Sequence, residues 1–187
     1  MDSVDRWRYG ISITSLVIIF SAVVYMGDKD YVAKPMGIGS DTLGPDSDET
    51  FSEYHQRSLS TVATALEEHP HDHAYGLVCF NQQLSAPDAA ATVAKLQRIN
   101  GLQIGGYPIV GIPAPVNIGL AQHFVQQAEL KRLDSNDIRC VVAHDEPTQF
   151  SALQSDPRVA SIEVLPPDAA WGRFSVKPVL GAHHDAQ

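Results

Sequence analysis

Histidines at alternating positions are the densest group of potential metal ligands in this chain of 187 residues. His69, His71 and His73 lie in the run HPHDH, and imidazoles beside a carboxylate can bind zinc or copper. His183 and His184 could join them from the C-terminal end, but no metal-binding run with helical spacing accompanies the first. We interpret residues 69–73 as a solvated junction between a helix and a strand, with metal binding as the alternative.

The two cysteines, Cys79 and Cys140, lie within predicted strands and are 61 positions apart. In an oxidising compartment a disulfide between them would stabilise the fold by about 3–5 kcal/mol. Two reduced cysteines buried as small hydrophobic residues fit the sequence equally well, so the pairing stays open. A catalytic Cys/His pair is disfavoured, because no neighbouring residue would lower the thiol pKa.

Asp145 and Glu146 form a carboxylate pair after a predicted strand, and two carboxylates are what a glycosidase requires. Adjacent carboxylates at a strand end are more often a solvated turn. The glycines at 105, 106 and 111 match neither a dinucleotide-binding pattern nor a phosphate-binding loop, and there is no G-x-S-x-G motif. The sequence therefore predicts no enzyme, with no catalytic, cofactor-binding or metal-binding residues.

The charge balance excludes one class of partner. Thirteen Lys and Arg against twenty-two Asp and Glu give a net charge of -9, whereas nucleic-acid binding requires clustered basic residues. Thirteen Gly and twelve Pro are close to ordinary usage, which argues against a broadly disordered chain.

Residues 9–27 carry no charge and include the run ISITSLVIIFSAVVYM. As a helix they would extend about 28 Å, close to the thickness of the bilayer hydrocarbon. A cleaved signal peptide is the alternative, but no A-x-A-like cleavage site follows. We predict a single transmembrane anchor.

The orientation of that anchor depends on the residues that flank it. Arg6 and Arg8 balance Lys29 and Lys34, and the free amino terminus adds positive charge to the short side. We therefore expect residues 1–8 in the cytoplasm and the domain that follows the anchor outside the cell membrane.

The remaining chain divides into segments by composition and periodicity. Residues 28–45 are Gly- and Pro-containing and predict an extended tether. Asp46 and Glu49 have the spacing of a capping box, so a helix is predicted over 46–68, with Phe51, Tyr54, Ser58 and Val62 on its apolar face.

Strands and helices alternate through the predicted domain at 69–167. The pattern predicts strands at 75–82, 107–112, 138–144 and 159–165, and helices at 85–99, 117–133 and 148–154. Such alternation favours an α/β sandwich. Our preferred arrangement is ferredoxin-like, with an extra helix between the second and third strands. Residues 168–187 are predicted to be an extended tail.

Three short motifs carry a resemblance to a known group of proteins. Leu43-Gly44-Pro45-Asp46-Ser47 precedes Glu49 and Tyr54, DPRVASIEVLP spans 156–166, and WGRF spans 171–174. Together they resemble small single-pass membrane proteins of actinobacteria that have an external α/β domain. Asp48 stands where that pattern has Gly.

Within that group, the size and layout are similar to an accessory subunit of the cytochrome bcc–aa3 respiratory supercomplex. The resemblance implies a non-catalytic role in assembling or stabilising a membrane complex, with integral membrane subunits and lipid as neighbours. Two alternatives have different chemistry. One is an extracytoplasmic copper or zinc handling protein that uses residues 69–73, and the other is a cell-envelope enzyme.

Overall fold

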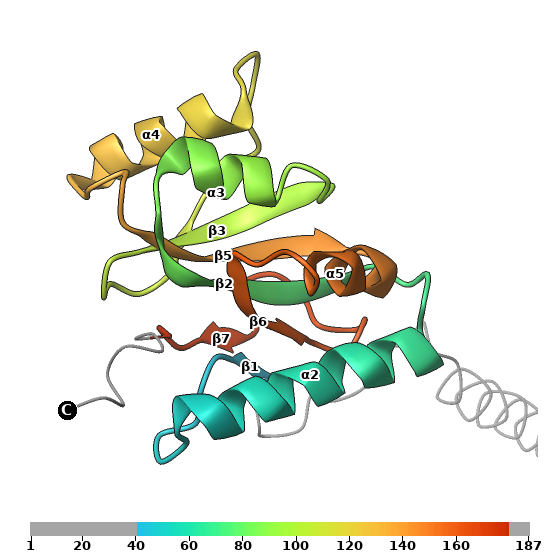
Figure 1. Ribbon diagram of the computed structural model, residues 1–187. Coiled ribbons are helices and arrows are strands. Elements are labelled where there is room, and N and C mark those ends of the chain that lie inside the picture. The colour runs from blue at the N-terminus through green and yellow to red at the C-terminus, as the bar shows by residue number, and fades with distance from the viewer. Residues whose placement is uncertain (1–40, 180–187) are drawn as a thin grey trace, which may run out of the picture. The chain divides into compact units, whose positions relative to one another are not determined.

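The computed structural model describes residues 41–179 (Figure 1). The predicted cytoplasmic tail, the anchor at 9–27, most of the tether and the end of the C-terminal tail lie outside the described residues. Within 41–179, no helix has both the length and the apolar character needed to cross a membrane.

A five-stranded antiparallel sheet forms the centre of the described part, in the order β4-β3-β5-β2-β6. Its strands are β2 (Ala74–Leu84), β3 (Arg98–Ile104), β4 (Val110–Gly111), β5 (Ile138–Asp145) and β6 (Val159–Val164). The chain passes from β2 through α3 (Ala86–Thr92) to β3, and β5 lies between these two strands. It then passes from β5 through α5 (Pro147–Leu153) to β6, on the far side of β2. The predicted mixed α/β class is confirmed.

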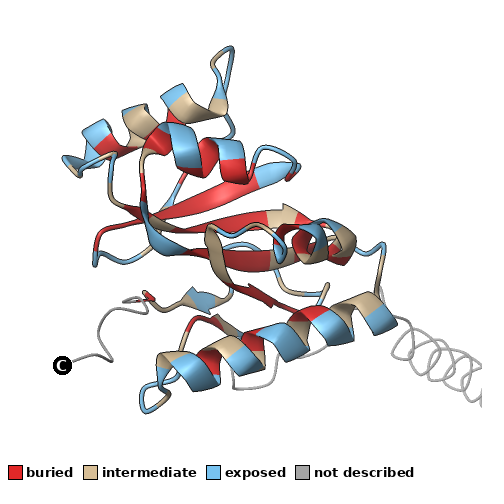
Figure 2. Ribbon diagram, viewed as in Figure 1, coloured by how far each residue is buried: buried red, intermediate tan, exposed pale blue. Residues whose placement is uncertain are grey.

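The sheet is covered on both faces, as the buried strands in Figure 2 show. Along β2, Val78 and Phe80 belong to the core shared with α3, α4 (Leu120–Lys131) and α5. Leu77 and Cys79 belong to a second core on the opposite face. Alternate residues of a strand point to opposite faces, so β2 has to be apolar on both.

The long helix α2 (Phe51–Glu68) packs along β6, the edge strand of the sheet. Thr50 is its N-cap and forms a capping box with Glu53, whose carboxylate accepts the Thr50 N–H at 2.9 Å. The prediction that the helix begins at Asp46 is wrong, whereas its end at Glu68 is confirmed. Residues 46–49 instead form a turn, in which Glu49 accepts the Asp46 N–H at 2.9 Å.

Two further sequence predictions need correction. The helix expected over 85–99 ends at Thr92, and Arg98–Ile104 is a strand. Asn and Gly are poor strand formers, so the RINGLQI segment gives a weak strand signal, yet Leu102 and Ile104 fill the core beside β5. The strand expected at 107–112 is reduced to the two residues of β4. Helix α4 begins at Leu120 instead of following Asn117, which has a positive φ of 58°.

A disulfide between Cys79 and Cys140 joins the central strand β5 to its neighbour β2. The two residues are direct register partners, with Cα atoms 4.1 Å apart, and each is only 1% exposed. The structure thus answers the question that the sequence left open. Disulfides of this kind persist in oxidising compartments and are rare in the cytosol of most organisms.

Candidate functional site

The three motifs that carry the resemblance meet on one side of the domain. The first includes β1 (Thr42–Leu43), which pairs in parallel with β7 (Ser175–Val176), directly after the WGRF segment. The second supplies Glu163 in β6, whose carboxylate contacts the first motif. We call this meeting point of 41–49, α2, β6 and β7 the motif junction.

Glu163 is the central residue of the motif junction and is 2% exposed. Its Oε2 accepts the Gly44 N–H at 2.6 Å, and Arg57 of α2 donates to its Oε1. Burial raises the pKa of the Glu163 carboxyl, and the bonds from Gly44 and Arg57 oppose that rise. The carboxylate therefore depends on these two donors for its place in the core.

Arg57 connects Glu163 to the turn that precedes α2. Its Nε and Nη2 donate to the two carboxylate oxygens of Glu49 at 2.8 and 2.9 Å, and Nη2 also donates to the Gly44 carbonyl at 3.1 Å. The hydrogen bond from Arg57 is the main reason that the pKa of Glu49 lies below its ordinary value. A planar guanidinium can serve both carboxylates at once, which a lysine could not do in the same geometry.

Gly44 is required by its backbone as well as by its hydrogen bond. Its φ is +97°, and a Cβ at this position would lie 2.5 Å from the carbonyl oxygen of Lys177. The close approach arises because the Lys177 N–H donates to the Leu43 carbonyl at 2.8 Å. The glycine of the first motif therefore allows β1 and the chain after β7 to pack together.

The aromatic residues of the third motif cover the second core. Trp171 and Phe174 lie with their ring centroids 5.7 and 5.1 Å from that of Tyr75. A Cβ on Gly101 or Gly111 would lie 3.4 or 3.5 Å from the Trp171 ring, so the indole packs over the β3–β4 pair. The residues of this motif thus have a structural role in the described domain.

The histidine segment is a turn between α2 and β2, as the sequence predicts, and its three imidazoles have different neighbours. His69 Nδ1 lies 3.0 Å from Asp72, and His71, 82% exposed, lies 3.6 Å from Glu146. The His73 ring lies 5.5 Å from that of His144, whose pKa is lowered mainly by burial. Residues 41–179 contain no group of three or more side chains placed to hold a metal ion.

The carboxylate pair at the end of β5 is divided between two structural roles. Asp145 is 5% exposed, and its two oxygens accept the N–H groups of Gln97 at 2.6 Å and of Glu146 at 2.8 Å. Glu146 occupies the N-cap position of α5 without a side-chain capping bond, and its carboxylate accepts the Thr148 hydroxyl at 3.3 Å. Asp145 thereby fixes the loop before β3 to the end of β5, and the two carboxylates do not face each other across a cleft.

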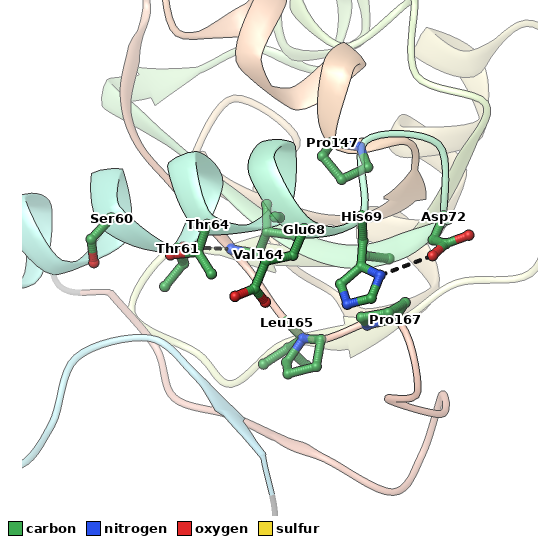
Figure 3. Close-up of a pocket in the computed structure, with 13 residues that line it drawn as sticks. Ser60, Thr61, Thr64, Glu68, His69, Asp72, Pro147, Val164, Leu165 and Pro167 are labelled. Atoms are coloured by element: carbon green, nitrogen blue, oxygen red, sulfur yellow. Dashed lines mark hydrogen bonds and ion pairs between the residues drawn. The ribbon is translucent and has the colours of Figure 1, made fainter. Parts of the chain in front are cut away.

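A groove with a volume of about 280 Å³ lies between the C-terminal half of α2 and the segment that follows β6 (Figure 3). Ala65, Val164 and Leu165 contribute apolar surface, while Glu68 and His69 extend from the end of α2 towards Leu165 and Pro167. We call this the α2 groove. Sequence reasoning missed it because no motif marks it; the available signals were the Pro166-Pro167 pair and the end of the amphipathic helix at Glu68.

No known protein family, curated protein or solved structure matches this chain at a significant level.

Replacing Glu163 with Gln tests the motif junction. We expect the free energy of unfolding to fall by about 2–3 kcal/mol, because Arg57 loses a buried partner but remains one-third exposed to water. The measurement is chemical denaturation of the full-length chain. The matched control is Asp46→Asn, which removes the exposed ion pair to Lys177 in the same region and should have a much smaller effect. Equal losses in both variants would contradict a special role for Glu163.

Proposed function

We propose that this protein is a non-catalytic, membrane-anchored accessory subunit that stabilises or assembles a larger membrane complex. The respiratory bcc–aa3 supercomplex is the complex to which the sequence resemblance points. One observation carries the proposal: the first and second motifs are far apart in the sequence but join in the motif junction, and the third motif leads directly into β7, which pairs with β1. The resemblance therefore concerns one structural unit of the chain, and that unit lies where the segment after the predicted anchor enters the domain.

The predicted location of the domain outside the cell membrane has two lines of support. Residues 9–27 form an uncharged run long enough for one span. The Cys79–Cys140 disulfide suits an oxidising compartment, which the outer side of the membrane provides. In this proposal residues 1–8 remain in the cytoplasm.

The strand order also supports the finer fold assignment that we propose, a ferredoxin-like sandwich. Strands β2, β3, β5 and β6 with helices α3 and α5 have the order of two interleaved β-α-β units. Helix α4 is then the extra element between the second and third strands of that arrangement.

The topology is tested with a reporter that fluoresces only in the cytoplasm, fused after Gln187. We expect the fusion to be dark, and we expect Cys79 and Cys140 of the denatured chain to resist thiol alkylation until a reductant is added. The same reporter fused before Met1 is the control and should fluoresce. A bright C-terminal fusion with free thiols would contradict the proposed location.

The accessory role is tested by copurification from mild detergent, followed by mass spectrometry of the partners. The anchor contains small residues that permit close helix packing; they are Gly10, Ser12, Ser15, Ser21, Ala22 and Gly27. The tether adds apolar residues at Tyr31, Val32, Met36 and Ile38. We expect an unrelated anchor helix, or a Gly/Ser tether, to weaken copurification with a respiratory complex. Unchanged copurification in both variants would contradict these contacts.

A deletion strain separates the accessory role from catalysis. Loss of the protein should lower the yield or stability of the supercomplex more than the turnover of its oxidase. The proposal would fail if the domain without anchor and tether turned over a substrate and restored the deletion strain by itself.

A further inference from the structure

The α2 groove combines an apolar surface with a group of acceptors at one end. Ala74, Val164 and Leu165 are buried residues that line it, and Pro166 and Pro167 complete that side. Its volume of about 280 Å³ is slightly below the range of roughly 300–1,000 Å³ that holds drug-sized ligands. The groove therefore suits one or two side chains of a partner rather than a large cofactor.

The hydrogen bonds already made inside the α2 groove leave few donors available. Ser60 donates to the Arg57 carbonyl at 2.7 Å, and Thr61 donates to the Ser58 carbonyl at 2.8 Å. The N–H groups of Val164 and Leu165 donate to Thr61 Oγ1 and to the Tyr75 carbonyl. Pro166 and Pro167 have no N–H. Apart from the Thr64 hydroxyl, the lining residues can thus offer a partner chiefly acceptors.

Those acceptors are anionic. The Glu68 carboxylate has no hydrogen-bond or ion-pair partner among residues 41–179, and it extends into the groove in Figure 3. Asp72 uses one oxygen for His69 Nδ1 at 3.0 Å, which leaves its other oxygen. No Lys or Arg lines the groove.

We propose that the α2 groove binds an arginine side chain from an extended segment of a partner protein. The alkyl stem would lie on Ala65, Leu165 and the prolines, and the guanidinium would donate to Glu68 at the polar end. Arginine fits better than lysine because its weakly hydrated, planar head group tolerates an apolar wall while it donates to a carboxylate. This inference rests on the proposed accessory function and gives the chemistry of the partner.

The test uses the full-length chain in lipid nanodiscs, with methyl groups of Ala and Leu labelled for NMR. The probe is the peptide acetyl-Ala-Pro-Arg-Pro-Ala-amide, compared with the same peptide carrying citrulline or glutamate in the central position. We expect the arginine peptide to shift the Ala65 and Leu165 signals saturably and to leave the buried Ala128 of α4 unchanged. The neutral citrulline peptide should bind about tenfold more weakly, and the glutamate peptide should cause no shift.

Two variants locate the interaction. Glu68→Gln should weaken binding of the arginine peptide about tenfold, whereas Glu67→Gln, outside the groove on the same helix, should not change it. Thr64→Trp should fill the groove and abolish the shifts without removing a charge. Equal affinity for the arginine and citrulline peptides, or no shift with either, would overturn the proposal.

The chain's own basic residues are the rival occupant. If Lys29→Gln/Lys34→Gln shifts the Ala65 and Leu165 signals in the absence of peptide, the segment before the domain fills the groove and the proposal is wrong. Failure of the groove inference can be distinguished from failure of the proposed accessory function. A chain that copurifies through its anchor and tether but ignores the arginine peptide would overturn the groove inference alone.

Discussion

The lost hydration of a carboxylate that is buried in an apolar domain has to be replaced by hydrogen-bond donors. This constraint organises the side of the protein where the chain enters the fold. Removing Glu163 from water costs several kcal/mol unless donors replace the lost hydration. The donors are Gly44, from the segment before α2, and Arg57, from α2 itself. Because both must reach β6, the buried charge fixes the positions of the entering segment and the helix together.

The rest of the motif junction follows from that placement. Arg57 bonds to Glu49 and so holds the turn at residues 46–49 beside α2, which begins at Phe51 after its N-cap Thr50. With Gly44 held against β6, Leu43 of β1 pairs with β7. The chain after β7 then passes so close to Gly44 that a side chain at this position would have no room. The α2 groove lies at the other end of the same helix, so its walls depend on how α2 is held along β6.

The parts of the fold that could be predicted from sequence are those where local pattern and burial agree. β5 and β6 are apolar runs between turn residues, and the stripe of Tyr54, Ser58 and Val62 is buried as its spacing indicates. β3 could not be found in this way, because Asn100 and Gly101 are poor strand formers. Gly101 pairs with Val142 of β5, whereas Asn100 lies at an irregularity in that pairing. Two capping patterns lie close together before α2, Asp46 with Glu49 and Thr50 with Glu53. The structure uses Thr50 as the N-cap, while Glu49 bonds to Arg57.

Long-range contacts explain what sequence reasoning missed at the candidate site. Cys79 and Cys140 become neighbours because β2 and β5 pair in one specific register, which spacing alone does not determine. In the sequence, nothing distinguishes Glu163 from an ordinary polar residue within an apolar strand. Its partners Arg57 and Gly44 are 106 and 119 positions away. The acidic end of the α2 groove likewise comes from a helix terminus placed opposite a proline pair.

Native-state hydrogen exchange of the Gly44 and Lys177 amides tests most directly whether the motif junction belongs to the core of the domain. Both N–H groups are bonded across the junction, to Glu163 and to the Leu43 carbonyl. If the motif junction belongs to the core, both amides exchange as slowly as amides of β2 and β5 and with the same dependence on denaturant, as members of one cooperative unit. Exchange as fast as that of the exposed Asp48 amide would contradict it, and would show that the entering segment is only loosely attached to the sheet.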